Sequence, residues 1–153
     1  LNNDGVVDIL DIVIMVNMII NPQPSIQINS GTSYGFCWGY CIFELDINNS
    51  FSRYSTYSWI DDPNFPTLVI EENLTFNAWQ NVINLVDFVY FLALEDVYGC
   101  PDCADGGSEW IEITYEGTTK KVLFEANSVV GGIEELTLFL RDLRQNYYDQ
   151  LFP

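Results

Sequence analysis

The residues best suited to chemistry lie at the start of the chain, where oxygen-bearing side chains recur at short intervals. In an EF-hand-type calcium loop the ligands occupy the first, third, fifth, ninth and last positions, and a backbone carbonyl comes from the seventh. A glycine at the sixth position makes the sharp turn. With the first position placed on the residue before Leu1, the pattern continues without a gap and Gly5 makes the turn. The expected calcium ligands are Asn2, Asp4, Val6, Asp8 and Asp11.

The last loop position and the helix after it distinguish this loop from an ordinary EF-hand. Asp11 stands where ordinary EF-hand loops carry a glutamate, and an apolar stretch follows from Ile12 to Ile20. Over residues 1–21 the chain resembles one repeat of a bacterial dockerin. The resemblance implies calcium binding, an extracellular location and a cohesin-like partner, which would be recognised through the side chains beside the last ligand, Ile9 and Leu10.

This segment leaves alternatives open. A turn of Asn, Asp and Gly that only caps the following helix would produce part of the same pattern, although five positions matching in register favour calcium. Dockerins pair two repeats, whereas this sequence shows one, and the first loop ligand falls before Leu1. Ile9 and Leu10 could therefore pack on a second repeat or on the following domain, and not on a cohesin.

The composition excludes several kinds of partner and chemistry. The chain has 22 acidic and 5 basic residues, a net charge of −17 and no histidine. Such a charge repels phosphate backbones and anionic lipid surfaces, so we expect neither nucleic acid nor a membrane surface as a partner. The lack of histidine removes His-dependent triads and His-ligated zinc, which argues against an enzyme. No apolar run reaches the ~20 residues that span a bilayer.

Four cysteines form two close pairs in the sequence, Cys37 with Cys41 and Cys100 with Cys103. Disulfides are the first expectation, because a dockerin-like segment belongs in an oxidising compartment. Four cysteines allow three connectivities. A bridge between the two pairs would close a ring of roughly 60 residues, worth about 4 kcal/mol. A zinc site built from all four thiolates is a weaker alternative.

A redox role for Cys100 and Cys103 is a third interpretation of the same residues. Their spacing is that of thiol–disulfide catalysts, in which a helix N-terminus lowers the pKa of the first thiol. Here Asp96, Asp102 and Asp105 lie close by, and their negative charge would raise that pKa instead. No strand followed by a helix surrounds the pair, so thioredoxin-like chemistry is disfavoured.

Acidic and aromatic side chains raise the alternative of a carbohydrate-active or carbohydrate-binding domain. A glycosidase needs two carboxylates facing one another across a cleft. The candidates for that pair are Asp102, Asp105, Glu109 and Glu112. No spacing singles out two of them, so solvated surface positions explain them better. The candidates for a sugar-stacking platform are Trp38, Tyr40, Tyr54, Tyr57 and Trp59. Strand alternation predicts that about half of these rings point into a core.

The rest of the chain alternates between strand and helix patterns. Two prolines end the first helix, so we divide the chain into a calcium repeat at 1–21, a linker at 22–24 and a domain at 25–153. Strands are expected near residues 26–28, 43–47, 51–59, 67–71, 110–115 and 121–125. A helix is expected from an N-cap at Asn77 and another after Ile133.

This order of elements predicts an α+β fold. A mostly antiparallel sheet would be packed by a central helix and a C-terminal helix, preceded by the short EF-hand-like loop and helix. Residues 30–145 also resemble an uncharacterised domain family of secreted proteins and lipoproteins in Bacteroidetes-like bacteria. The likeness lies in the glycine- and cysteine-rich segments 35–41 and 99–107 and in the order of the elements around them. It implies secretion and fold and adds no chemistry.

Together these features predict an extracellular, non-catalytic, calcium-binding module for anchoring or assembly. Its expected setting is a cell surface or a polysaccharide-degrading complex, with a cohesin-like or cell-surface protein and a polysaccharide as candidate partners. The alternatives are a carbohydrate-binding or carbohydrate-active domain and a thiol-redox domain that uses Cys100 and Cys103.

The calcium loop gives a direct prediction. In a protein extended upstream by the first loop ligand, millimolar calcium is expected to raise the thermal unfolding midpoint. The reason is that the metal binds the folded loop and not the unfolded chain. A chelator should reverse the shift, and the Asp4→Ala variant should not respond to calcium. An unchanged midpoint in wild type, matching that of the variant, would contradict the metal site.

Overall fold

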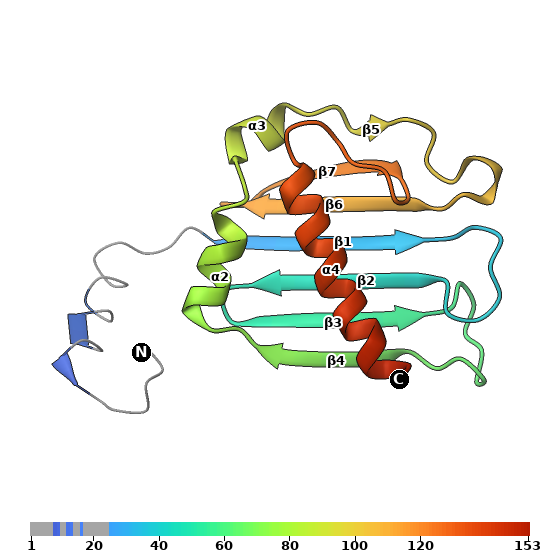
Figure 1. Cartoon of the computed structure of the whole chain (residues 1–153), viewed down its shortest axis with the longest axis horizontal. Coiled ribbons are helices and arrows are strands. Elements are labelled where there is room, and N and C mark those ends of the chain that lie inside the picture. Colours follow the sequence, from blue (N-terminus) through green and yellow to red (C-terminus); the bar gives the residue numbers. More distant parts are fainter. Residues whose placement is uncertain (1–7, 10–11, 14–15, 17–24) are drawn as a thin grey trace.

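The computed structural model describes residues 25–153 together with residues 8, 9, 12, 13 and 16. Figure 1 shows a sheet with helices α2 and α4 lying over the same face. The strands are β1 (Ile26–Ser33), β2 (Ile42–Asn48), β3 (Phe51–Tyr57), β4 (Leu68–Asn73), β5 (Val97–Tyr98), β6 (Ser108–Tyr115) and β7 (Thr118–Glu125). The helices are α2 (Phe76–Ile83), α3 (Phe88–Ala93) and α4 (Glu134–Leu151), and a 3-10 turn spans Cys103–Asp105.

The strands form one sheet of seven in the order β4-β3-β2-β1-β6-β7-β5. Every neighbouring pair is antiparallel except β5 and β7, which run parallel. The first strand in the sequence therefore lies at the centre and pairs with β2 on one side and β6 on the other. This architecture confirms the predicted α+β fold with a mostly antiparallel sheet, a central helix and a C-terminal helix.

Alternation along the strands gives the sheet one apolar and one polar face. On β1, Ile26 and Ile28 are buried under the helices, whereas Gln27 and Asn29 belong to the opposite face. The same alternation in β2, β6 and β7 sends one apolar row into a common core. The helices contribute Trp79, Val82, Phe91, Leu136, Leu140 and Tyr147 to that core.

The polar face carries a hydrogen-bond network centred on Asn29. The side-chain amide of Asn29 donates to Glu44 Oε1 and Asp46 Oδ1 at 2.8 Å each, and its oxygen accepts from the Trp110 indole at 2.6 Å. Tyr57 donates to the other oxygen of Glu44 at 3.0 Å. Burial and this carboxylate raise the pKa of Tyr57 to about 12. These polar groups satisfy one another, so the face is stable without an apolar layer above it.

The two short helices begin where a side chain can accept from a free backbone amide. The predicted N-cap at Asn77 is wrong by two residues, because Thr75 Oγ1 accepts from the Ala78 amide and caps α2. A separate helix, α3, follows α2, and its N-cap is Asp87, whose Oδ1 accepts from the Tyr90 N–H at 3.0 Å. Among the described residues, no helix has the length and apolarity required to cross a membrane.

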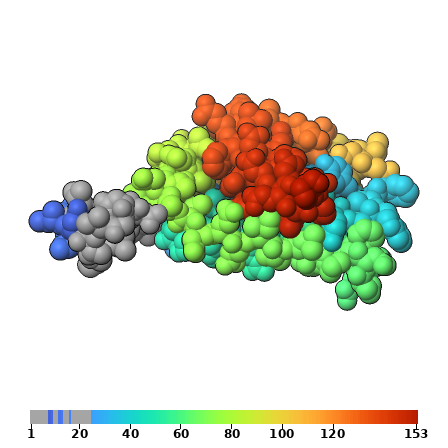
Figure 2. Space-filling model, turned by 60° about the horizontal axis from the view of Figure 1, so that its bottom comes forward, coloured from blue at the N-terminus to red at the C-terminus, as the bar shows by residue number. Residues whose placement is uncertain are grey.

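Helix α4 is fastened to the sheet by one buried carboxylate. Glu109 on β6 is 1% exposed and accepts from two arginines of α4, Arg141 at 2.6 Å and Arg144. Arg144 also donates to Ser30 on β1. Burial lowers the pKa of Arg144, while the neighbouring Glu109 opposes that change. Figure 2 shows α4 at the surface, so these polar contacts lie on its inner side.

The ion cluster gives a stability prediction. Replacing Glu109 by Gln leaves the two guanidinium groups without a compensating charge in a buried site, so the free energy of unfolding should fall by about 3–5 kcal/mol. Urea denaturation measures this change. Asp96→Asn is the matched control, because its carboxylate pairs with Lys120 but is 82% exposed, and its loss should stay below about 1 kcal/mol. Equal losses in the two variants would contradict the assigned role of Glu109.

Candidate functional site

Most of the predicted calcium ligands lie outside the described residues. These ligands are Asn2, Asp4, Val6 and Asp11, and the calcium site stays a prediction. Asp8 is described, and its carbonyl accepts from the Ile12 amide at 3.4 Å, the bond of a helical turn. Ile9 and Ile12 have helical backbone conformations. No group of three or more potential metal-ligating His, Cys, Asp or Glu residues occurs within the described residues.

The cysteines pair within each short motif. Cys37 bonds Cys41 and Cys100 bonds Cys103, with Cα atoms 5.6 and 5.5 Å apart. Of the three connectivities that the sequence allows, the structure has the purely local one, and no bridge joins the two motifs. All four sulfurs are used in these bonds, which is not the arrangement of a zinc site.

The Cys100–Cys103 loop differs from a thiol-redox motif in its backbone. Asp102, Ala104 and Asp105 all adopt positive φ angles, between 52° and 60°. Only a three-residue 3-10 turn follows, so no α-helix N-terminus is available to lower a thiol pKa. The geometry favours a rigid loop over a catalytic dithiol.

Both disulfide loops lie at one end of the sheet. Figures 1 and 2 place the β1–β2, β3–β4 and β5–β6 loops together there. Gly35 N–H donates to Asp102 Oδ1 at 3.2 Å and joins the two cysteine loops. The two loops approach closely here, and a Cβ at Gly35 would meet the Asp102 carboxylate and displace it. We call this end of the molecule the loop end.

Two tryptophans flank a cleft at the loop end. Trp38 is 83% exposed and Trp59 is 53% exposed. The Trp59 indole donates to the carbonyl of Tyr34 at 2.7 Å, and Trp38 packs edge-on against Phe65 with ring centres 6.4 Å apart. The cleft between them has a volume of about 280 Å³. We call it the tryptophan cleft, and it is lined by Gly35, Cys37, Trp38, Gly39, Ser58, Trp59, Ile60 and Asp62.

The structure separates the five aromatic candidates into different environments. Only Trp38 and Trp59 line the tryptophan cleft. Tyr40 is half-buried between Phe65 and Phe152, and Tyr57 belongs to the polar face of the sheet. Tyr54 is buried in the core and stacks on Tyr147 with ring centres 5.8 Å apart.

The four carboxylate candidates do not form a catalytic pair. Glu109 and Glu112 are three positions apart on β6, and because successive side chains of a strand alternate between its faces, the two belong to opposite faces. Both oxygens of Glu109 form salt bridges with Arg141 and Arg144. Glu112 lines a polar hollow of about 230 Å³ on the other face of the sheet. Asp102 and Asp105 belong to the Cys100–Cys103 loop. No two of these carboxylates flank a common cleft with the geometry of a glycosidase.

The sequence interpretation missed the buried arginines of α4. Leu136, Leu140 and Tyr147 mark the apolar stripe of the helix, and Arg144 falls on the same stripe, four residues after Leu140. A cation at a core position of a helix requires a buried partner. An arginine on the apolar stripe was the feature of the sequence that could have revealed this site. It stands out because the chain has only five basic residues.

The local disulfides predict a peptide map. Trypsin cleaves after Arg53 and therefore separates the two cysteine motifs. Without reduction, residues 1–53 and 54–120 should appear as separate peptides, each lighter by two hydrogens than its reduced form. Thiol titration in denaturant should find free thiols only after reduction. A peptide that joins the two segments would contradict the local connectivity.

Comparison with known proteins gives no family for this chain. It matches no protein-family model, and no curated protein matches it significantly. The dockerin-type repeat and the secreted-domain resemblance therefore stay predictions.

Proposed function

We propose that this chain is an extracellular, non-catalytic module that anchors or assembles a larger protein on a neutral polysaccharide. The observation that carries the proposal is the tryptophan cleft, in which two exposed indoles border a hollow of about 280 Å³. Large aromatic side chains are normally covered in a folded protein, so two at one opening favour a binding surface.

The chemistry of the cleft suits a sugar ring. The C–H face of a pyranose can stack on an indole, while the Asp62 carboxylate and the Ser58 hydroxyl in the same lining can bond sugar hydroxyls. A small number of placed polar groups among apolar walls is typical of ligand sites. The net charge of −17 favours a neutral polysaccharide over an acidic one.

The walls of the cleft are held before any ligand arrives. Cys37 and Cys41 lie on either side of Trp38, and their disulfide restricts the backbone that carries this ring. Trp59 is held by its bond to the Tyr34 carbonyl, so the β3–β4 loop is attached to the β1–β2 loop. Such preorganisation lowers the entropy lost on binding.

The N-terminal segment supports the assembly part of the proposal. Ile9, Ile12, Val13 and Val16 follow the i, i+3, i+4, i+7 spacing of one helix face and are all exposed. An exposed aliphatic face beside a calcium loop suits a protein partner or a second repeat. Calcium would order the loop and thereby fix the direction of this helix.

Retention on insoluble neutral polysaccharides, such as a β-linked glucan and a xylan, tests the proposed binding site. Trp38→Ala should weaken binding at least about tenfold, because the variant loses an aromatic surface worth about 1.5–3 kcal/mol when covered. The side chain is exposed, so its removal should leave the unfolding midpoint nearly unchanged.

Phe36→Ala is the matched control for this experiment. Phe36 is 87% exposed and lies in the same loop, but it is not part of the cleft lining. Its removal should leave polysaccharide retention close to that of wild type. The proposal fails if no neutral polysaccharide is retained, or if the Phe36 and Trp38 variants lose retention equally.

A further inference from the structure

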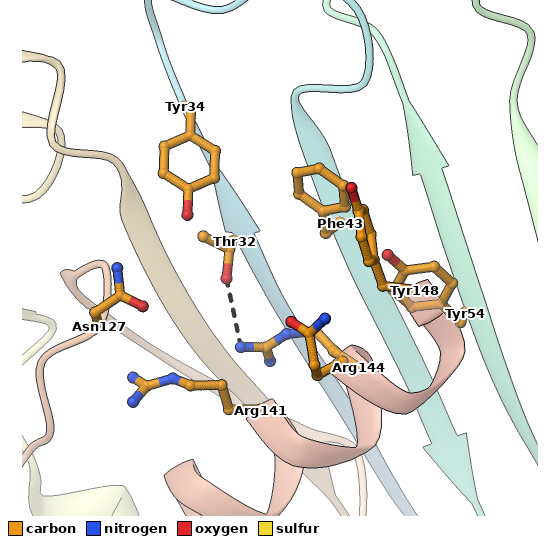
Figure 3. A pocket seen from close by; sticks show the side chains of 9 residues that line it. Thr32, Tyr34, Phe43, Tyr54, Asn127, Arg141, Arg144 and Tyr148 are labelled. Atoms are coloured by element: carbon orange, nitrogen blue, oxygen red, sulfur yellow. Dashed lines mark hydrogen bonds between the residues drawn. The ribbon is translucent and has the colours of Figure 1, made fainter. Parts of the chain in front are cut away.

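A further cavity lies between α4 and strands β1, β2 and β3, and Tyr34 lines it as well. It has a volume of about 310 Å³. Figure 3 shows side chains from β1, β2, β3, α4 and the β7–α4 segment facing a common space. We call it the arginine cavity, and it is lined by Thr32, Tyr34, Phe43, Tyr54, Asn127, Arg141, Arg144, Gln145 and Tyr148.

The charge of this cavity is opposite to that of the protein. Two of the chain's five basic residues, Arg141 and Arg144, line it, and no carboxylate does. Glu109 lies behind them and neutralises one of the two charges. The immediate surroundings therefore keep one net positive charge in a chain of net charge −17.

The arginines also keep hydrogen-bond donors that are not used inside the protein. Arg141 donates from Nε and Nη2 to Glu109, and from Nη2 to the Ser128 carbonyl. Arg144 donates from Nη1 to Ser30 and from Nη2 to Thr32 and Glu109. Within the described part of the chain, Arg141 Nη1 and Arg144 Nε have no acceptor. An arginine offers five donors, so this site has capacity for an acceptor from outside.

Tyr54 is an independent sign of a missing partner. Its side chain is 1% exposed and lines the cavity, yet its hydroxyl has no hydrogen-bond partner. Burial raises the pKa of Tyr54, which keeps the hydroxyl protonated and able to donate. Buried hydroxyl groups are nearly always bonded, and an orphan beside two arginines indicates a place for a ligand acceptor.

We propose that the arginine cavity binds a small organic carboxylate, with its anionic group at Arg141 and Arg144 and its ring between Phe43, Tyr34 and Tyr148. The two oxygens of a carboxylate supply acceptors for the donors that Arg141 and Arg144 leave free. One net positive charge balances one carboxylate and not the two charges of a phosphate. The aromatic walls suit the flat or C–H face of an attached ring. The site is separate from the tryptophan cleft and does not depend on the proposed polysaccharide binding.

Paired probes that differ only in charge test this site. Titration of the full chain with benzoate and benzamide, and with glucuronate and glucose, can be followed by calorimetry and by arginine side-chain NMR signals. At least one of the two acids should bind, ten times or more tighter than its neutral counterpart. The member that binds identifies the source of the carboxylate, aromatic acid or sugar acid. Inorganic phosphate should bind more weakly than that acid.

Three variants locate the binding. Arg141→Gln removes hydrogen-bond donors and a positive charge at a partly exposed position. It should lower the affinity for the acid at least tenfold. Arg53→Gln is its charge-matched control, because Arg53 is exposed on the polar face of the sheet, and should bind as wild type does. Tyr54→Phe should weaken binding about five- to tenfold while the unliganded protein stays as stable as wild type or becomes more so.

The response of Tyr54→Phe separates a ligand site from a structural role, since a merely structural hydroxyl would affect stability and not affinity. The proposal is overturned if neither acid binds, or if both bind no tighter than their neutral counterparts. Tighter binding of phosphate, or full affinity in both Arg141→Gln and Tyr54→Phe, also overturns it.

Discussion

The position of α4 depends on one carboxylate, Glu109, buried between the sheet and two arginines of the helix. A buried charge is costly unless it is paired with an opposite charge. The glutamate of the sheet and the arginines of the helix therefore each need the other as a partner. Because Arg141 and Arg144 are three residues apart, both reach one carboxylate only when a single helix face turns inward. This electrostatic requirement fixes the rotation of α4, which apolar contacts alone would leave less defined.

The same ion cluster separates the two halves of the helix layer. On one side of it, Leu136 and Leu140 pack in a continuous apolar core. On the other, Arg141, Arg144 and Tyr148 line an open space between α4 and the sheet, next to the buried Tyr147. A core filled by leucines throughout would exclude that space. The molecule thus combines a closed core, a polar sheet face that satisfies itself, and a loop end that carries exposed rings.

Much of the fold follows from the sequence because strand alternation is visible in short segments. Ile26 and Ile28, or Phe43, Leu45 and Ile47, mark one face of a strand without knowledge of its neighbours. Strand β5 was not predicted, since two residues carry no period and its pairing with β7 depends on the distant hairpin. The cap of α2 was misplaced because Thr75 and Asn77 are both suitable acceptors and only the backbone path selects between them.

The candidate sites are less visible in the sequence. Tyr54 and Trp59 look alike as aromatic residues near a strand, and alternation assigns them to different environments only once the register is known. The arginine cavity combines β1, β2, β3 and α4, so it depends on tertiary contacts between residues as far as 114 positions apart. The cysteine connectivity could not be predicted for a related reason. The same four positions allow disulfides within each motif and disulfides between the two motifs.

The short disulfide rings have a consequence for how this protein is made. Each joins cysteines only four or three positions apart. The loop-entropy relation gives such rings about 2 kcal/mol, compared with about 4 kcal/mol for a bridge between the two motifs. Their oxidation therefore does not have to wait for the sheet, because the partners are already neighbours in the nascent chain. Each ring lies within one loop and joins no two strands, so these bonds act mainly on the form of a surface and not on the strand order.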